Sequence, residues 1–404
     1  MSRCILVLNA GSSSLKFALY PVAGQHALSR GVIDWAGEST HAELRLRGSI
    51  GEESSQAVSV RSMGDAVGLA LSAVQERANR EGGANLSEVV AIGHRVVHGG
   101  TVFVQSVVID AAVRQGIANL SVLAPLHNPP ALAAMCAAAV ALPHLPQVAV
   151  FDTAYFSTLS PRAFLYPVPY EWYTDWGIRR FGFHGISHSY CALRAADMLG
   201  RPLTELKLVI CHLGNGCSAS AVTNGKALTT SMGFTPLDGL MMGTRPGSLD
   251  PGILLSLQQK SGMTAESLQQ DLNHQSGLLG ISGISSDMRQ VEAAALQGHE
   301  RARLALEMYT DRVRATIGAM AVTLGGLDAV VFTAGVGENS TGIRAAVCQG
   351  LEFIGLQLDP DRNRSQRPDC DIATATSRSR ILVIETREEL TISQDVSRVL
   401  RLTA

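Results

Sequence analysis

The sequence predicts a two-lobed α/β protein. Its 404 residues are enough for two domains with complete cores. In three places an apolar strand runs straight into a glycine-rich polar loop: residues 5–14 (ILVLNAGSSS), 206–220 (LKLVICHLGNGCSAS) and 327–340 (LDAVVFTAGVGENS). The first two continue into another apolar segment, so each is interpreted as the opening hairpin of a lobe. The repeated pattern indicates equivalent phosphate-facing turns in both lobes.

Composition restricts the class of protein. A hydrophobic content of 46% and a charged content of 17% are typical of a globular chain, and the net charge of −2 predicts neither a nucleic-acid nor an anionic membrane partner. The seven cysteines form no CxxC pair, which favours reduced, mostly buried thiols. No signal-peptide pattern opens the chain, and the apolar stretch 131–142 is too short to span a bilayer. We therefore expect a cytoplasmic protein.

Apolar periodicity locates the main elements. Spacing near 3.6 predicts helices over 65–78, 187–199, 251–260 and 300–324, and an apolar run predicts a strand over 148–152. Residues 358–380 are polar and loop-like, and the tail from residue 381 reads as a strand, a turn and a short helix. The expected division is an N-terminal lobe over 1–150, joined by the tail 385–404, and a C-terminal nucleotide-binding lobe over 151–384.

The first hairpin turn carries groups that suit a phosphate. It holds Asn9, a glycine, three serines and Lys16, so the backbone can approach an anion closely and an ammonium can neutralise it. An ordinary polar hairpin turn remains the alternative for this motif alone. The chain contains neither a Walker loop nor a GxGxxG fingerprint, so phosphate would be bound by a different device.

Histidines occur in three further motifs: GHRVVHGG (93–100), PLHNPP (125–130) and RRFGFHGISH (179–188). Two pairs are spaced four residues apart, but neither pair has the HExxH glutamate or a nearby cysteine, which disfavours zinc. The proline-framed His127 suits a structural role and a ligand contact equally well.

Charged residues complete the pattern. Asp152 ends an apolar strand, where a side chain points into the usual ligand crevice of an α/β protein, although it could instead cap the following turn. Arg245 lies in a Gly-Pro-Gly loop without local partners, which favours an anionic ligand. Glu388 and Glu389 follow a terminal strand, where a solvated pair is the alternative. Together these groups indicate phosphoryl transfer, with acids holding a hard cation.

These motifs, taken together, resemble the acetate kinase family. LNAGSSSLKF, GHRVVHGG, PLHNP, FDTAYF, RRFGFHGISH, CHLGNGCS, MGTRPGSLDPG, SDMR and GVGEN occur in that family's order and spacing over nearly the whole chain. The resemblance implies the fold of the sugar kinase, Hsp70 and actin superfamily, an α/β protein of two duplicated ribonuclease-H-like (actin-like ATPase) lobes with an interlobe cleft. It also implies reversible transfer of the γ-phosphoryl of ATP to acetate with Mg²⁺ (or Mn²⁺), by a homodimer.

Roles follow from the resemblance position by position. It implies Asn9 and Glu388 at the metal, and Asp152, His184, Arg245 and Arg95 as catalytic residues. It implies a substrate site of Arg95, Val97, Leu126, His127, Phe183 and Pro236. The implied nucleotide-binding residues are Ser12, Ser14, Lys16, His212, Leu213, Gly214, Asn215, Gly216, Asp287, Met288, Arg289, Gly335, Val336, Gly337, Glu338 and Asn339.

For Asp152, physical reasoning differs from the base that the family is often given. A carboxylate acceptor with a pKa of about 4 to 5, judged by side-chain carboxyls, is already ionised at neutral pH, so no proton has to be removed before attack. We therefore expect Asp152 to orient an arginine or the metal's water. Two departures from the family pattern, Phe181 in place of tyrosine and Arg387 beside Glu388, remove none of the implied roles.

Other functions remain as alternatives. A propionate or butyrate kinase of the same family differs only in pocket volume, and one methylene contributes about 1–3 kcal/mol to discrimination. An actin- or Hsp70-like ATPase would explain the phosphate loops but not the conjunction of Arg95, His184 and Arg245. A sugar kinase would need a base for its hydroxyl acceptor.

Overall fold

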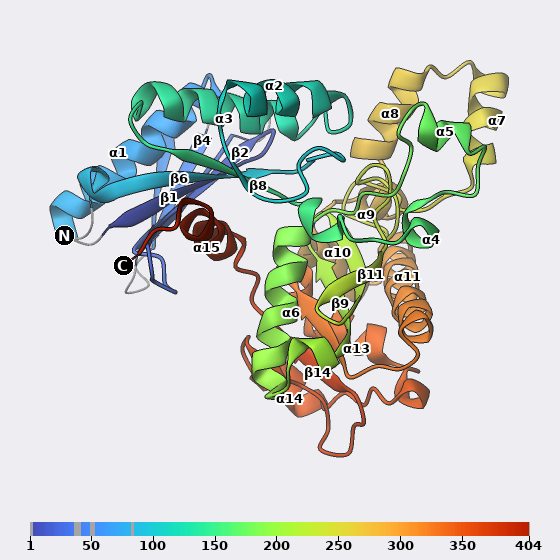
Figure 1. Cartoon of the computed structure of the whole chain (residues 1–404). Coiled ribbons are helices and arrows are strands. Elements are labelled where there is room, and N and C mark those ends of the chain that lie inside the picture. Colours follow the sequence, from blue (N-terminus) through green and yellow to red (C-terminus); the bar gives the residue numbers. More distant parts are fainter. Residues whose placement is uncertain (1–2, 36–41, 49–52, 82–84, 404) are drawn as a thin grey trace. The chain divides into compact units, whose positions relative to one another are not determined.

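The computed structural model describes residues 3–35, 42–48, 53–81 and 85–403, and it separates into two compact units (Figure 1). Unit 1 comprises Met1–Ser157 and Arg387–Ala404, and unit 2 comprises Thr158–Thr386. The predicted boundary at 150/151 falls inside unit 1, because the strand before Asp152 pairs with a strand of the first sheet. Asp152 therefore belongs to unit 1 and not to the second lobe.

Unit 1 is built on one mixed sheet of eight described strands in the order β5-β4-β3-β2-β1-β6-β8-β7. Helices α1 and α3 cover one face of the sheet, and α15 covers the other (Figure 1). The elements are β1 (Cys4–Ala10), β2 (Ser14–Pro21), β3 (Ser29–Asp34), β4 (Ala42–Gly48), β5 (Glu53–Val58), β6 (Val89–Val96), β7 (Val107–Val108), β8 (Gln147–Phe151), α1 (Met63–Glu81), α2 (Ala111–Asn119), α3 (Asn128–Ala141) and α15 (Glu388–Leu400).

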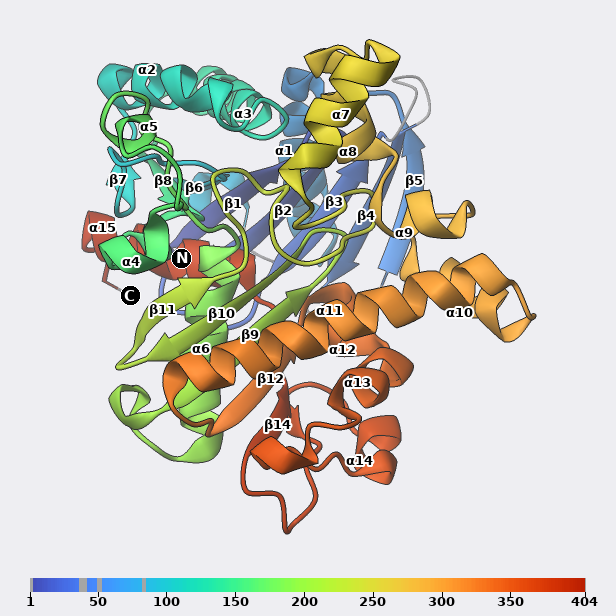
Figure 2. The same cartoon turned by 90° about the vertical axis from the view of Figure 1, so that its right-hand side faces the viewer.

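Unit 2 contains a six-stranded sheet in the order β11-β10-β9-β12-β14-β13. Helix α6 packs on β9 and β12, and α11 lies along the sheet against β9 and β10 (Figure 2). The elements are β9 (Lys207–Leu213), β10 (Cys217–Thr223), β11 (Lys226–Thr230), β12 (Ala329–Thr333), β13 (Cys370–Asp371), β14 (Arg380–Val383), α4 (Pro161–Phe164), α5 (Glu171–Thr174), α6 (Gly185–Leu199), α7 (Pro251–Ser261), α8 (Ala265–His274), α9 (Gly277–Ser282), α10 (Met288–Leu296), α11 (Glu300–Leu324), α12 (Ala334–Asn339), α13 (Thr341–Cys348) and α14 (Pro360–Ser365).

The two sheets share one five-stranded topology. In unit 1 the order β3-β2-β1-β6-β8 has antiparallel neighbours up to β1 and parallel neighbours beyond it. In unit 2 the order β11-β10-β9-β12-β14 repeats that pattern. The expected duplicated, ribonuclease-H-like α/β architecture is confirmed in each unit.

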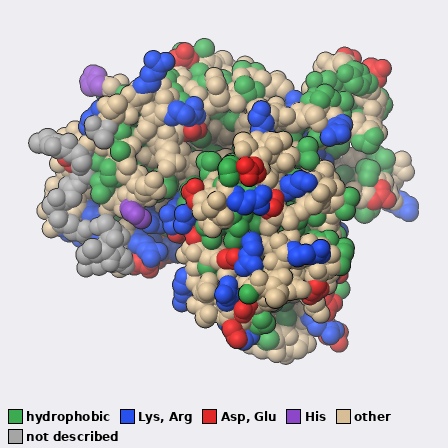
Figure 3. All heavy atoms as spheres, turned by 60° about the horizontal axis from the view of Figure 1, so that its bottom comes forward, with side chains coloured by type: hydrophobic (Ala, Val, Ile, Leu, Met, Phe, Trp, Pro, Cys, Tyr) green, Lys and Arg blue, Asp and Glu red, His purple; other side chains and the backbone are tan. Residues whose placement is uncertain are grey.

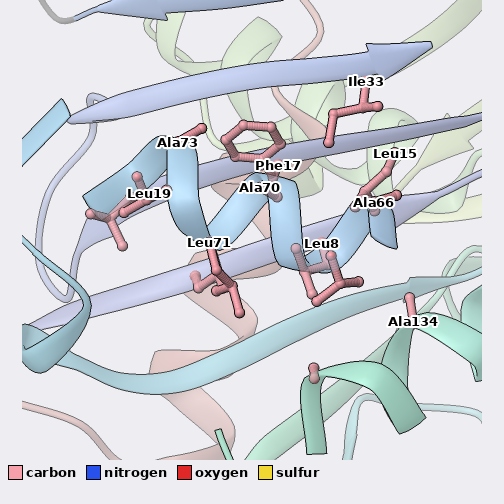
Figure 4. Close-up of a cluster of buried hydrophobic side chains, with 14 of the residues drawn as sticks. Leu8, Leu15, Phe17, Leu19, Ile33, Ala66, Ala70, Leu71, Ala73 and Ala134 are labelled. Carbon is pink, nitrogen blue, oxygen red and sulfur yellow. The ribbon is translucent and has the colours of Figure 1, made fainter. Parts of the chain in front are cut away.

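The core of unit 1 forms where α1 packs on the sheet (Figure 4). Small residues on α1, Ala66, Ala70 and Ala73, let the helix approach strands that contribute Phe17 and Ile33. All five are 5% exposed or less, and burial of such apolar surface is the dominant favourable term in folding.

On the opposite face, α15 approaches β6 closely at a glycine. A Cβ on Gly93 would lie 2.7 Å from Cγ2 of Ile392 and 2.8 Å from Cγ2 of Val396, closer than carbon atoms can pack. Because Glu388 is the first residue of α15, the absence of a side chain at Gly93 helps to place that carboxylate.

Most predicted elements are confirmed, with local corrections. The helices predicted at 65–78, 187–199, 251–260 and 300–324 correspond to α1, α6, α7 and α11. The loop-like interpretation of 358–380 was incomplete, since the segment holds α14 and β13, and the tail helix α15 is 13 residues long rather than short. The third glycine-rich loop is also helical, because α12 begins at Ala334 directly after β12.

The surface of the described residues is mixed in charge. On the face drawn in Figure 3, basic and acidic side chains are interspersed. All seven cysteines have free thiols, and only Cys136 is exposed. Among the described helices, none has both the length and the apolar character needed to cross a membrane.

One buried histidine in β6 makes the stability of unit 1 depend on pH. His94 is 1% exposed, and burial lowers its pKa to about 4, although a hydrogen bond with Gln147 opposes the shift. The unfolded chain therefore takes up a proton as the pH falls below 6.5, which the native state resists until about pH 4.

We expect the free energy of unfolding of unit 1 to fall by about 2 kcal/mol between pH 7 and pH 5 through His94 alone. Urea unfolding followed by the fluorescence of Trp35, in a Trp172→Phe, Trp176→Phe background, would measure it. His94→Gln should reduce the pH dependence by that amount, and equal pH dependences in the two chains would contradict the prediction.

Candidate active site

In unit 1, polar side chains gather where three neighbouring strands end. Asn9 lies near the end of β1, Arg95 near the end of β6, and Asp152 directly after β8. These strands are parallel neighbours in the sheet, so their carboxyl ends meet at one edge. Glu388 and Glu389 reach the same group from the first turn of α15.

Arg95 is the centre of this group, which we call the Arg95 cluster: Asn9, Arg95, Asp152, Glu388 and Glu389. Its Nη2 donates to Oδ2 of Asp152 over 2.7 Å, and its Nε lies 3.2 Å from both carboxylate oxygens. Its Nη1 lies 3.4 Å from Oε2 of Glu388 and 3.5 Å from Oδ1 of Asn9. The Asn9 amide donates to Glu388 and Glu389, each over 3.4 Å.

The electrostatics of the cluster follow from burial. Asp152 is 0% exposed and Glu388 is 6% exposed, so neither charge is solvated as it would be in water. Burial acts to lower the pKa of Arg95, but the carboxylates of Asp152, Glu388 and Glu389 outweigh it, and the pKa is raised. Arg95 therefore stays charged, and three carboxylates facing one guanidinium leave the cluster with excess negative charge.

The donor set of the cluster suits a hard divalent cation. Carboxylate and amide oxygens are the ligands of Mg²⁺, which is commonly bound through one or two carboxylates, waters and substrate phosphates. In the part of the chain that the structure describes, no group of three or more His, Cys, Asp or Glu side chains is arranged to hold a metal unaided. The carboxylates and the amide of the cluster therefore fit Mg²⁺, whose remaining coordination positions are commonly filled by waters and substrate phosphates.

The hairpin turn of unit 1 adds a cation to this edge. Lys16 is the cross-strand partner of Asn9, so the two side chains leave the same face of the sheet. Lys16 and Ser12 are exposed, while Ser14 opens β2 and is half-buried. The described residues therefore leave the Lys16 ammonium accessible to an anion.

In unit 2, α6 begins at a residue in left-handed conformation. His184, the residue before α6, has a φ of +60°. Residues other than glycine adopt this left-handed backbone conformation at an energetic cost. Its ring stacks on His212 of β9 with centroids 4.2 Å apart, and its Nδ1 lies 2.9 Å from Oγ of Ser218. His184 and His212 thus lie side by side at the end of the second sheet.

Arg245 lies against the same loop. Its Nη1 donates to the carbonyl of Pro236 over 3.0 Å. A Cβ on Gly216 would lie 3.0 Å from Nη2 of Arg245 and 3.4 Å from Nε2 of His184, so the missing side chain leaves room for both. Burial lowers the pKa of Arg245, and among the described residues no carboxylate is paired with it. Such an arginine is suited to an anionic ligand.

A cavity of about 740 Å³ lies in unit 2, within the range of nucleotide-sized sites. Eight residues of the predicted nucleotide set line it: Gly214, Asn215, Asp287, Met288, Arg289, Gly335, Val336 and Asn339. Leu278, Ser286, Glu292 and Ser340 also line it and were missed by sequence reasoning. The structure therefore joins three predicted motifs, at 212–216, 287–289 and 335–339, around one hollow.

The other predicted nucleotide residues do not line that cavity: Ser12, Ser14 and Lys16 belong to unit 1, and His212, Leu213, Gly216, Gly337 and Glu338 lie elsewhere in unit 2. Leu213 is 0% exposed within β9, and Gly337 lies against Phe332. The Glu338 carboxylate accepts from the backbone N–H of Ala334 and of Thr386, each over 2.8 Å, and burial raises its pKa. Glu338 therefore braces α12.

The predicted substrate residues are divided between the units. Val97, Leu126 and His127 belong to unit 1 and are half-buried. Phe183 and Pro236 belong to unit 2, where Phe183 is 1% exposed. Neither unit alone assembles the predicted methyl pocket, which stays a prediction.

Sequence reasoning missed two features of the site. Glu389 was given no role in the site, yet it contacts Asn9. The solvated alternative for Glu388 is wrong, because that carboxylate is 6% exposed. The polar face of β10 was also missed. The sequence contains two signals for it: Ser218 and Ser220 are two residues apart in a strand, and His184 and His188 are four residues apart in a helix.

Comparison with known proteins covers almost the whole chain. The sequence model of the acetokinase family matches residues 4–394. An acetate kinase from a Nostoc species is 48% identical over 404 residues, covering 98% of this chain and 99% of the relative.

Two solved structures are equally similar in fold to this chain. The crystal structure of Porphyromonas gingivalis acetate kinase has a TM-score of 0.90 at 39% identity and covers 98% of this chain and 100% of its own. A propionate kinase from Francisella tularensis has a TM-score of 0.90 at 38% identity, with coverage of 97% and 98%.

Proposed function

Because the chain belongs to the acetokinase family, we propose that it transfers a phosphoryl group reversibly between ATP and acetate, giving acetyl phosphate and ADP. It is an enzyme, a phosphotransferase with a carboxyl group as acceptor and ATP or ADP as nucleotide substrate. The observation that carries the proposal within the structure is that unit 2 holds both a nucleotide-sized cavity and Arg245, a half-buried cation that is paired with no carboxylate among the described residues.

The transfer is a direct in-line displacement. An oxygen of acetate forms the new bond to phosphorus while the bond to the bridging oxygen of ADP breaks, and the charge of the metaphosphate-like group is spread over its equatorial oxygens. Arg95, Arg245 and His184 supply positive charge and N–H donors for that charge. Acetate is already ionised at neutral pH, so no base is required.

Asp152 orients the guanidinium of Arg95. Its buried carboxylate accepts from Nε and Nη2, which fixes the plane of the guanidinium and leaves Nη1 on the side of Asn9 and Glu388. This bidentate geometry supports the orienting role expected from the acid strength of the substrate.

A divalent cation completes the site in this proposal. Asn9 and Glu388 would hold Mg²⁺, or Mn²⁺ in its place, and the excess negative charge of the Arg95 cluster supports the assignment. When bound, the cation supplies charge neutralisation at the nucleotide phosphates. From the hairpin turn, Lys16 would add a positive charge at the phosphates, and Ser12 and Ser14 would add hydroxyl hydrogen bonds.

Acetate rather than propionate or butyrate is the proposed acceptor, because relatives named acetate kinase match almost the whole chain. The equal fold similarity of a propionate kinase shows that the fold does not discriminate between these acids. The discrimination is assigned to the apolar side chains Val97, Leu126, Phe183 and Pro236.

We further propose a cytoplasmic homodimer. Free thiols on all seven cysteines suit a reducing compartment. Helix α7 buries none of its residues, and its side chains Ile253, Leu255 and Leu257 are 49%, 59% and 37% exposed. A second copy covering this helix would remove the exposed apolar surface from water.

Acyl-hydroxamate formation with ATP and Mg²⁺ tests the function. Acetate should give the highest kcat/KM, with propionate and butyrate lower by about 10-fold or more, since each added methylene has to be accommodated. Chelation of the metal with EDTA should abolish product. A higher kcat/KM with propionate would reassign the acceptor, and ATP hydrolysis without any hydroxamate would leave the ATPase alternative.

Asp152→Asn tests the orienting role. The amide keeps the volume but places an N–H2 group against the guanidinium, so we expect kcat to fall by about 100-fold with the pH profile unchanged. Asp110→Asn is the matched control, because Asp110 caps α2 and asparagine caps equally well. Loss of a basic limb of the profile in Asp152→Asn would instead identify a base.

Sedimentation velocity tests the dimer. Leu255→Lys on α7 should convert the protein to monomers, because it would bury a charge in an apolar interface. Leu296→Lys is the control, since Leu296 is 90% exposed on α10 and should leave the assembly intact. A dimer that survives Leu255→Lys would place the interface elsewhere.

A further inference from the structure

A chain of hydrogen bonds leads from His184 into the interior of unit 2. Its Nδ1 lies 2.9 Å from Oγ of Ser218, the same hydroxyl lies 2.7 Å from Nε2 of His188, and Nδ1 of His188 lies 2.7 Å from Oγ of Ser220. Ser218, His188 and Ser220 are all 0% exposed. No step proposed for the reaction uses these three residues.

Local geometry explains how the chain forms. Ser218 and Ser220 alternate along β10 and therefore point to one face of the sheet. His184 and His188, four residues apart at the start of α6, lie on one face of that helix.

The number of partners decides the direction in which the hydrogens run. Among the described residues, the Ser220 hydroxyl has one hydrogen-bond partner, Nδ1 of His188. If Ser220 accepted there, its own O–H would be a buried donor without an acceptor, which costs more than an unused lone pair. Ser220 therefore donates to His188.

The remaining hydrogens follow from that choice. Burial, aided by the nearby His212, lowers the pKa of His188 well below 6.5, so this ring is neutral and carries one hydrogen. With Nδ1 accepting from Ser220, the hydrogen of His188 is on Nε2 and is donated to Ser218. The Ser218 hydroxyl then donates its own hydrogen to Nδ1 of His184.

We propose that Ser220, His188 and Ser218 are positioning residues that hold His184 as the neutral tautomer with its hydrogen on Nε2. This inference rests on the proposed function for its consequence, because Nε2 is the ring nitrogen beside Arg245 at Gly216. The chain thus turns a second N–H donor toward the place where Arg245 is available to an anion.

Protonation of His184 at Nδ1 requires every hydrogen bond between Ser220 and His184 to exchange its donor and acceptor. Ser218 would then donate to His188, the hydrogen of His188 would move to Nδ1, and the Ser220 hydroxyl hydrogen would lose its acceptor. Two further titratable or charged groups of the described residues face the His184 ring: His212, stacked on it from β9, and Arg245, whose charge also opposes a second cation.

The first test observes the hydrogens directly. Two-bond ¹H–¹⁵N correlation spectra of the full-length protein with ¹⁵N-labelled histidine distinguish the two ring nitrogens, and the His184 signals are identified by their absence in His184→Gln. At pH 7 we expect Nε2 protonated and Nδ1 unprotonated. A hydrogen on Nδ1, alone or together with one on Nε2, would overturn the proposal.

The second test removes the donor that sets the direction. In Ser220→Ala the hydrogen bonds among His188, Ser218 and His184 can point in either direction, so Nδ1–H of His184 should become detectable. The kcat/KM for acetate should fall in proportion to the lost Nε2–H fraction, about twofold for an equal mixture. Ser220→Thr keeps the hydroxyl and should restore both readouts. Ser379→Ala, which deletes another buried hydroxyl of unit 2, should change neither.

The two tests separate the inference from the proposed function. A wild-type protein that makes no acetyl phosphate would refute the function, while the spectra would still decide the tautomer. An unchanged tautomer in Ser220→Ala, or a loss of activity without a change of tautomer, would refute the positioning role.

Discussion

The buried charge of Asp152 is the constraint on which unit 1 depends. A carboxylate with no exposure to water is stable only beside a fixed counter-charge, and Arg95 supplies it with two N–H groups. Arg95 can reach Asp152 because β6 and β8 are parallel neighbours that end together. The same guanidinium then gathers Asn9 and Glu388, so one electrostatic requirement organises residues that are far apart in the sequence.

Unit 2 meets a comparable requirement with neutral groups. There the sheet edge carries hydroxyls and imidazoles whose hydrogens must all be placed, and each partner restricts the next. The two units thus share a topology but not a chemistry. The first concentrates charge at its strand ends, while the second presents hydroxyl and imidazole donors beside Arg245, which no carboxylate of the described residues neutralises.

The sequence predicted the elements best where a local pattern determines them. The periodic helix 300–324 and the strand before Asp152 are examples, and so is the repeated hairpin that revealed the duplication. Burial was harder to predict: Glu388 and Glu389 form a pair that is usually solvated, and only the packing of α15 on Gly93 brings them to Asn9. The segment 335–339 read as a loop because its glycines disfavour helix, yet Glu338 accepts from the N–H of Ala334 and supports α12. The cavity-lining Ser286 and Ser340 could not be found by composition, since such serines are common in turns.

Because α15 lies at the C-terminal end of the described chain but packs on unit 1, unit 1 can be completed only at the end of synthesis. Unit 1 starts first, but its sheet keeps one face uncovered until α15, which follows all of unit 2, has left the ribosome. The apolar residues Ile392 and Val396 arrive with that helix, and so does Glu388. A nascent or truncated chain that ends before α15 therefore exposes hydrophobic surface on β1 and β6 and lacks a site carboxylate, which makes it a natural client for chaperones and proteases.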